Sequence, residues 1–302
     1  ERSTHCVSVD DGHPYYTFLL GYPIESYFRS QSDSVSGPSG NDTGKQNPDG
    51  GSEEQEAEEA NGYDALLWGF LRFGLYETAY SMALEYRDSL DSNLLLVLAR
   101  QLGVQGKYYE SMVTARTALS RPDYSGTIQE YKLLYPRAFL SRIKELGSQY
   151  GIPLPVLYGL VREESYFDPE IVSHAGAVGL SQLMPTTAEH VASLMKKESY
   201  DLTDPNDNLE IGSYYLGRML NRFDRISYSL FAYNAGPGRV TEWDRKFGSL
   251  PDELFLEAIP FQETRHYLRK VLVTAVFYGY LYENEKPEKV IQLFFPEYTL
   301  KK

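Results

Sequence analysis

The segment from Pro155 to Pro169 predicts an amphipathic helix with an acidic residue on its apolar face. Proline suits the first turn of a helix, and the residue before a proline avoids the helical region, so the helix should end near Asp168. Apolar residues recur at helical spacing, namely Val156, Leu157, Leu160, Val161 and Phe167. At about 100° per residue, Glu164 lies roughly 25° from the centre of this stripe and Glu163 roughly 75° from it. The pattern therefore directs Glu164 into the interior.

A carboxyl group in this position has the properties of a general acid. Burial among apolar groups disfavours the anion, so the pKa of Glu164 should rise and the group should stay protonated near neutral pH. Arg162 lies on another face of the helix and is expected to point to solvent. A glutamate paired with a buried arginine, or one at a frayed helix end, would show the same spacing.

Three further segments combine small and polar residues in turns. Gly176 to Pro185 is a glycine-punctuated turn, Ala232 to Gly238 ends a helix with a Tyr-Asn pair, and Ile259 to Arg265 opens another helix. Together with Glu164-Ser165, and in this order, they resemble the motifs of the soluble lytic transglycosylase catalytic domain, which is related to goose-type lysozyme. The resemblance extends from about residue 135 to about residue 285.

The resemblance implies an all-α, lysozyme-like domain in a bacterial enzyme of the periplasm or cell envelope. Such an enzyme cleaves the β-1,4 bond between N-acetylmuramic acid and N-acetylglucosamine in peptidoglycan glycan strands, and it leaves a 1,6-anhydromuramoyl end. Most glycosidases need two carboxyl groups. Here Glu164 alone would protonate the leaving oxygen and then accept the proton from O6 as that oxygen closes onto C1.

The resemblance also implies six substrate contacts: Ser173, Gln182, Met184, Tyr233, Asn234 and Glu263. Four of these residues have a structural alternative. Met184 would plug the core before Pro185, the Tyr-Asn pair would form a helix C-terminus before Gly236, and Glu263 would be a first-turn glutamate favoured by the helix dipole.

Two other acids lie close to Glu164 in the sequence. Asp168 is four residues further on, and its place before Pro169 favours a turn or capping role. Glu163 occupies a position where the family more often has glutamine or another polar residue, and it is expected to lie on the rim.

The chain divides into four predicted parts. Residues 1–29 include an aromatic stretch, His13 to Leu20, that should dock on the helical body. Residues 30–62 hold eight acids against one lysine and few apolar groups, which predicts a disordered linker. Residues 63–135 should form a helical-repeat region, and residues 136–302 the catalytic domain.

The repeat region carries a recurring pattern. Gly74-Leu75-Tyr76, with Ala83 seven residues after the tyrosine, recurs 32 residues later as Gly106-Lys107-Tyr108 and Ala115. This spacing resembles tetratricopeptide-type helical hairpins. The lytic transglycosylase family often has an α-superhelical region ahead of its catalytic domain, and such a region can bind a protein partner.

Two helix starts are predicted in the catalytic domain. Thr186 to Glu189 has the pattern of a capping box, and Asp204 to Asp207 has an Asp-Pro start. Val271 to Tyr282 is the longest apolar run, but it is interrupted by a threonine and a glycine and falls short of the 18 or so apolar residues of a membrane helix. It should be a buried core helix, and no transmembrane segment is predicted.

Composition excludes several classes of protein. The net charge is −13, and the part from Pro136 onward holds 19 Lys/Arg and 22 Asp/Glu, so no basic surface for nucleic acid is expected. The five histidines lack metal-ligand spacing and no phosphate or dinucleotide loop occurs, so no metal and no cofactor are predicted. A single cysteine permits no internal disulfide, and no signal peptide is visible after Glu1.

Two rival functions remain. A hydrolase of the same bond, like goose-type lysozyme, would differ only in admitting water to the bound cation. A non-catalytic, helical-repeat protein that binds peptidoglycan would most simply have lost the acid, and Glu164 is present.

Overall fold

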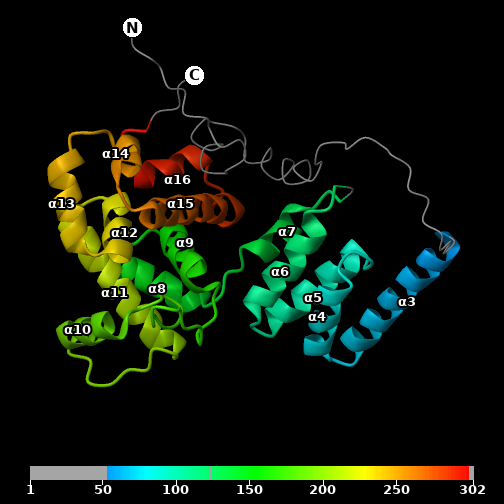
Figure 1. The fold of residues 1–302 in the computed structure, drawn as a ribbon. Helices are drawn as coiled ribbons and strands as arrows, with labels where there is room; N and C mark the ends of the chain where they lie inside the picture. Colours follow the sequence, from blue (N-terminus) through cyan, green and yellow to red (C-terminus); the bar gives the residue numbers. More distant parts are fainter. Residues whose placement is uncertain (1–52, 123, 299–302) are drawn as a thin grey trace, which may run out of the picture. The chain divides into compact units, whose positions relative to one another are not determined.

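The computed structural model describes residues 53–122 and 124–298, which form two compact units that divide between Pro136 and Arg137 (Figure 1). Within these ranges the helices are joined by loops, with isolated bridges at Val172–Val178 and Val178–Leu183 and no strand. The all-α prediction is confirmed. The predicted docking segment 1–29 and residues 30–52 of the predicted linker lie outside the described residues.

The first unit is built from short helices joined by tight turns. They are α3 (Glu53–Arg72), α4 (Tyr76–Glu85), α5 (Ser92–Val104), α6 (Tyr108–Leu119), α7 (Ile128–Tyr131) and the 3₁₀ turn η1 (Lys132–Leu134). Because α3 begins at Glu53, residues 53–62 are helical, and the linker prediction is wrong for these ten positions. Their glutamate, glutamine and alanine residues favour a helix, and acidic residues at its N-terminus suit the helix dipole.

The 32-residue repeat is visible in the backbone. Gly74 and Gly106 adopt φ values of 71° and 78°, a left-handed conformation that glycine enters without steric penalty. After each glycine, the next amide returns to the preceding helix: Leu75 N donates to Phe70 O and Lys107 N to Leu102 O, both at 2.9 Å. The two helical hairpins α3–α4 and α5–α6 therefore close in the same way.

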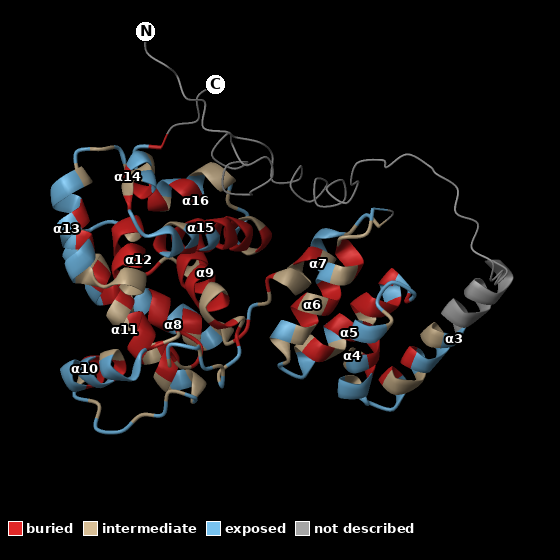
Figure 2. Ribbon diagram, in the orientation of Figure 1, coloured by how far each residue is buried: buried red, intermediate tan, exposed pale blue. Residues whose placement is uncertain are grey.

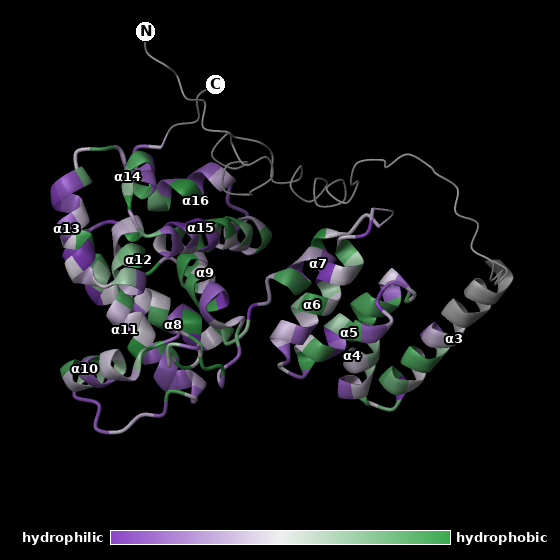
Figure 3. Ribbon diagram, in the orientation of Figure 1, coloured by the Kyte–Doolittle hydropathy of each residue, from purple (hydrophilic) through white to green (hydrophobic). Residues whose placement is uncertain are grey.

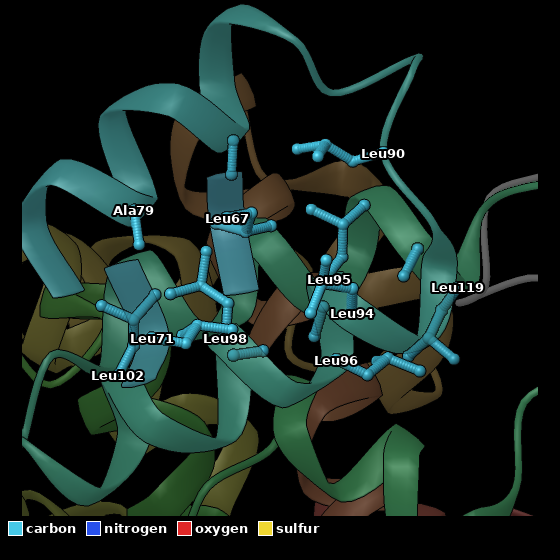
Figure 4. Close-up of a cluster of buried hydrophobic side chains, with 14 of the residues drawn as sticks. Leu67, Leu71, Ala79, Leu90, Leu94, Leu95, Leu96, Leu98, Leu102 and Leu119 are labelled. Atoms are coloured by element: carbon cyan, nitrogen blue, oxygen red, sulfur yellow. The ribbon is translucent and has the colours of Figure 1, made fainter. Parts of the chain in front are cut away.

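Leucine and alanine side chains form the core of this unit (Figure 4). Leu67, Leu95, Leu96, Leu98, Leu102, Ala79 and Ala115 are all exposed by 1% or less. The small residues let neighbouring helices approach closely, and the leucines fill the space between them.

The second unit contains the predicted catalytic helices. They are α8 (Leu140–Tyr150), α9 (Leu154–Ser165), α10 (Pro185–Met195), α11 (Pro205–Phe223), α12 (Ile226–Ala235), α13 (Pro237–Phe247), α14 (Asp252–Ala258), α15 (Gln262–Glu283) and α16 (Pro287–Phe294). Helix α15 packs against α9, α12 and α16 and is buried over most of its length (Figure 2). The peripheral helix α13 is mostly hydrophilic, whereas α15 is hydrophilic in its first turns and hydrophobic in its later part (Figure 3).

The core helix predicted at Val271 to Tyr282 lies within α15, and that prediction is confirmed. None of the helices in the described ranges is long and apolar enough to cross a membrane. Helix α9 packs along α15, and Gly159 lies at the closest approach. A Cβ atom at this glycine would lie 2.8 Å from the carbonyl oxygen of Val271, so only glycine lets the two backbones come this near.

Helix α9 ends at Ser165, three residues before the predicted end. Tyr166 and Phe167 adopt left-handed φ values of 49° and 64°, which terminate the helix. The Ser165 hydroxyl accepts a hydrogen bond from the amide of Phe167 at 3.1 Å. The proline signal marks the following turn instead, where Asp168 Oδ1 accepts from Glu170 N at 2.9 Å, as the turn interpretation predicts.

The two predicted helix starts have different outcomes. Helix α10 begins at Pro185 with Met184 as its N-cap, so the capping box predicted at Thr186 is wrong. Pro185 already has the φ of a first-turn residue, which places Thr186 inside the helix. Helix α11 begins as predicted, with Asp204 accepting from the amides of Asn206 and Asp207 at 2.9 and 3.0 Å.

Candidate active site

One cleft in the second unit, of about 450 Å³, is lined by all seven residues that the sequence selected. They are Glu164, Ser173, Gln182, Met184, Tyr233, Asn234 and Glu263. They come from the end of α9, the loop before α10, the end of α12 and the start of α15. The cleft is also lined by Tyr215 of α11 and Thr187 of α10, for which the sequence analysis gave no indication.

Glu164 lies in the last turn of α9, on the same side of the helix as the apolar stripe. The stripe residues Val156, Leu157, Leu160, Val161 and Phe167 are exposed by 1% or less. The pKa of Glu164 is raised to about 7: burial is the largest cause, the negative charges of Glu163 and Glu263 add to it, and the Tyr267 hydroxyl opposes them. The direction is the one predicted from the stripe. A carboxyl with this pKa is protonated in a large part of the molecules at neutral pH.

The predictions for Arg162 and Glu163 are wrong. The side chains are only 7% and 6% exposed, and Arg162 Nη1 lies 2.6 Å from Glu163 Oε1. The hydroxyl of Thr274, on α15, donates to the same carboxylate oxygen at 2.5 Å. Both α9 side chains are thus buried as an ion pair against α15, neither exposed to solvent nor on the cleft rim.

The loop before α10 is held by its own backbone. The Ser173 hydroxyl accepts from Ala177 N at 3.0 Å, and Gly179 N donates to Ile171 O at 2.9 Å. The side-chain nitrogen of Gln182 donates to Ile171 O at 3.2 Å and to Gly179 O at 3.0 Å. The loop therefore holds the amide nitrogen of Gln182, and its carbonyl oxygen is the atom that can accept from a ligand.

The side chain of Asn208, on α11, supports this loop through hydrogen bonds. It is fully buried, accepts from Ser181 N at 2.7 Å, and donates to Val178 O and Leu202 O at 2.9 Å each. Gly179 lies against this amide with a φ of 73°, and a Cβ atom there would collide with the Asn208 side chain. Asn208 was missed in the sequence, because an asparagine on a buried helix face shows which groups it supports only after folding.

Tyr233 and Asn234 are fixed by single hydrogen bonds. The hydroxyl of Tyr233 donates to Ser181 O at 2.8 Å, and Asn234 Oδ1 accepts from the Thr264 hydroxyl at 2.8 Å. Burial, with a smaller contribution from Glu164, raises the pKa of Tyr233 well above its ordinary value, so the phenol stays neutral. Helix α12 ends directly after this pair, as the alternative interpretation predicted, and Gly236 follows with a φ of 89°.

Met184 and Glu263 are both accessible. Met184 is 40% exposed, so the alternative that it plugs the core is wrong. Glu263 is exposed in the first turn of α15 and lines the cleft. It fits the first-turn and the cleft interpretation at the same time.

Tyr267 is a further group near the acid that the sequence analysis missed. It lies four residues after Glu263, on the same face of α15, and this spacing was the available signal. Its side chain is buried, and within the described residues its hydroxyl has no hydrogen-bond partner of normal geometry, although it is close enough to lower the pKa of Glu164. Burial raises the pKa of Tyr267 well above its ordinary value, so the hydroxyl keeps its proton.

Comparison with known proteins gives the family of this unit. Residues 141–256 match the model of the transglycosylase SLT domain. The chain carries a transglycosylase SLT domain. The matched range includes Glu164, the loop before α10 and the Tyr233-Asn234 pair, whereas α15 with Glu263 and Tyr267 follows it.

Relatives with the same domain are named murein transglycosylases. The chain is 38% identical over 160 residues to the soluble lytic murein transglycosylase of Escherichia coli K12. This alignment covers 51% of this chain and 24% of that protein. A putative soluble lytic murein transglycosylase of Haemophilus influenzae is 30% identical over 207 residues, 67% of this chain and 34% of that protein. The aligned part of this chain therefore spans only a quarter to a third of these relatives.

The fold resemblance extends beyond the SLT domain. The crystal structure of the 70 kDa soluble lytic transglycosylase from Escherichia coli matches with a TM-score of 0.62 and 26% identity, over 90% of this chain and 43% of that one. The structure of a lytic transglycosylase Slt from Pseudomonas aeruginosa matches with the same TM-score, 24% identity, and 92% and 45% coverage. Both confirm the helical, lysozyme-like fold class predicted for this chain.

Within the described residues, no three histidine, cysteine or carboxylate side chains lie close enough to hold a metal ion. The SLT cleft instead presents one carboxyl of raised pKa, neutral tyrosines and a backbone loop. This arrangement can donate a proton to an oxygen of a bound ligand and take one back.

Proposed function

We propose that this chain is the catalytic part of a lytic transglycosylase acting on peptidoglycan glycan strands. It would cleave the β-1,4 bond between N-acetylmuramic acid and N-acetylglucosamine and form a 1,6-anhydromuramoyl end. The observation that carries this proposal is Glu164, a carboxyl with a pKa of about 7 in the cleft of an SLT domain. The murein transglycosylases among its relatives support the substrate class.

The reaction needs one carboxyl acting twice. Protonated Glu164 donates its proton to the glycosidic oxygen as the bond from that oxygen to C1 of the muramoyl residue breaks. The substrate's own N-acetyl group stabilises the positive charge at C1. The Glu164 anion then accepts the proton of the O6 hydroxyl while O6 bonds to C1, which restores the acid without consuming water.

Three contacts suit this sequence of steps. We assign the orientation of the N-acetyl group to the Gln182 carbonyl oxygen and the Tyr233 hydroxyl, which are held by the loop before α10. Met184, exposed at the cleft, offers an apolar surface for a sugar face. Ser173, Asn234 and Glu263 complete the polar lining.

Hydrolysis of the same bond is the second candidate, and Glu263 is the observation that favours it. This glutamate is a second carboxyl in the cleft, and hydrolases of the two-carboxylate type use such a group as nucleophile or base. Mass analysis of the products from purified peptidoglycan distinguishes the two reactions. The transglycosylase product is lighter than the hydrolytic one by one water, and reducing ends alone would contradict the anhydro mechanism.

The cellular setting follows from the substrate. Peptidoglycan lies in the bacterial cell envelope, so we place the enzyme in the periplasm or elsewhere in the envelope. The helical hairpins of the first unit are a candidate surface for a protein partner. Exposed apolar side chains on them, including Trp68 and Phe73, are compatible with such a contact.

Activity is expected to fall as the pH rises through about 7. Glu164 must be protonated to donate its proton, and its pKa of about 7 sets the pH at which half of it is ionised. The decrease should therefore lie far below the pH at which tyrosine or lysine titrates. Initial rates measured from pH 5 to 9, with folding followed by circular dichroism, check this; a flat profile would exclude Glu164 as the donor.

The same pKa predicts a stability effect. The folded-state pKa of Glu164 is raised from 4.5, so its carboxyl stabilises the fold fully below pH 4.5 and loses that contribution as the pH rises to about 7. Compared with the wild type, Glu164→Gln should be more stable at pH 8 and nearly equal at pH 4. Thermal melting of both proteins at the two pH values measures the difference.

In Tyr267→Phe, the loss of activity on the alkaline side of the pH profile (the alkaline limb) is expected to shift to higher pH. The hydroxyl lowers the pKa of Glu164, so removing it lets that pKa rise, and no hydrogen bond of normal geometry is lost elsewhere. Folding should be unchanged, since phenylalanine fills nearly the same volume. An alkaline limb at the wild-type position or lower would contradict this role.

A further inference from the structure

We propose that Glu163 is a positioning residue: held by Arg162 and Thr274, it anchors the end of α9 on α15 and sets a negative charge beside the catalytic acid. This inference deepens the proposed function and rests on Glu164 being the proton donor. It starts from a buried charge pair that the reaction itself does not use.

The geometry of the pair is unusual for neighbours in a helix. Consecutive residues point about 100° apart and do not normally face each other. Here Arg162 Nη1 and the Thr274 hydroxyl both reach Glu163 Oε1, at 2.6 and 2.5 Å, and Arg162 Nη1 lies 3.4 Å from the same hydroxyl. The three groups form a closed triangle between α9 and α15, directly before Glu164.

The triangle lies where α9 is already constrained. One turn earlier, Gly159 brings the two backbones into contact. One residue after Glu164, the Ser165 hydroxyl bonds to Val161 O and to Phe167 N, and the helix ends. Glu164 is therefore held on both sides, by the Glu163 anchor before it and by the serine cap after it.

Stability alone gives a weak reason for this pair. A buried ion pair contributes little net stability over apolar side chains of similar volume, because both charges must be desolvated. Its electrostatic effect on Glu164 has a definite sign, however. The Glu163 charge opposes ionisation of Glu164 and raises its pKa, after burial the largest of the contributions that do so.

Six charged or titratable groups lie around Glu164, from α9, α11, α12 and α15: Arg162, Glu163, Tyr215, Tyr233, Glu263 and Tyr267. Burial raises the pKa of each of the three tyrosines, so they are neutral across the working pH range. The charges that can act on the acid are therefore Glu263, in the exposed first turn of α15, and the buried pair of Arg162 and Glu163. Only the pair is shielded from salt and solvent.

Three variants separate the charge of Glu163 from its anchoring. Glu163→Gln removes the charge and also leaves Arg162 without this carboxylate, and both changes favour ionised Glu164. The alkaline limb should move to lower pH, by on the order of half a unit or more. Glu163→Asp and Thr274→Val keep the charge but break the anchor, so they should leave the limb in place and lower kcat several-fold with little change in KM.

A titration without substrate makes the test independent of activity. The carboxyl carbon of Glu164, followed by carbon-13 NMR in glutamate-labelled protein, should titrate at lower pH in Glu163→Gln than in the wild type. Glu189→Gln, an exposed glutamate on α10, is the matched control and should leave the titration unchanged. If Glu163→Gln does not fold, the kcat of Thr274→Val still shows whether anchoring α9 on α15 matters for the reaction.

The outcomes distinguish this inference from the proposed function. An unshifted Glu164 titration in Glu163→Gln, or wild-type kcat in Thr274→Val, overturns the positioning role while the proposed function stands. Glycan cleavage by Glu164→Gln at the wild-type rate would overturn the proposed mechanism itself.

Discussion

Glu164→Gln is expected to lower the rate of glycan cleavage by roughly 10²- to 10⁴-fold, the usual contribution of a general acid. Glutamine has nearly the same shape and keeps the packing around α9, but it has no proton that it can donate and recover at neutral pH. The rest of the cleft, including Tyr233 and the loop before α10, should stay in place. Soluble products released from purified peptidoglycan, quantified by mass spectrometry, measure the loss.

Two controls accompany this variant. Glu189→Gln makes the same chemical change at an exposed position on α10 and should keep full activity. Binding of glycan strands to Glu164→Gln should persist, because the other cleft residues are unchanged. Retained cleavage by Glu164→Gln would show that another group donates the proton, with Glu263 as the next candidate.

Asn208→Ala is expected to destabilise the protein by about 2 kcal/mol or more and to remove most of the activity. The change leaves Ser181 N and Leu202 O without this partner, whereas Val178 O keeps the hydrogen bond from Leu183 N. Each unsatisfied group costs about 1–3 kcal/mol, partly offset by relaxation or entry of water. Because Asn208 joins Ser181, Val178 and Leu202, the loop that carries Gln182 should lose its fixed geometry. Urea unfolding gives the free energy, and the glycan digest gives the activity.

Asn206→Ala is the matched control for this prediction. Asn206 lies two residues earlier on α11 and is exposed. Its substitution should change stability by less than about 0.5 kcal/mol. Equal effects of the two substitutions would show that the loop does not depend on the buried amide.

The inward position of Glu164, the proposed proton donor, could be predicted from the sequence because it depends on a local pattern. The apolar residues of α9 recur at helical spacing, and this alone places Glu164 near the middle of one buried face. The same local logic predicted the Asp204 cap and the core helix within α15. In each case residues close in the chain decide the outcome.

The prediction failed for Glu163 and Arg162 because α9 has more than one buried face. An interpretation with one apolar stripe assigns all positions outside that stripe to its edge or to solvent. In the structure, α15 also covers the neighbouring face of α9. Thr274, the partner of Glu163, is 111 residues away in the sequence. No feature of the α9 sequence indicates that a hydroxyl from α15 will donate a hydrogen bond to Glu163.

Sequence by itself therefore determined the helical fold, the 32-residue repeat and the inward position of Glu164, since periodicity and turn residues act over a few neighbours. Only the tertiary structure decided that the seven selected residues share one cleft, that Asn208 supports its loop, and that Tyr267 lies beside Glu164. These relations depend on how α9, α11, α12 and α15 pack on one another. Burial of Glu164 by that packing is the largest cause of its raised pKa, which lets the carboxyl hold a proton at neutral pH.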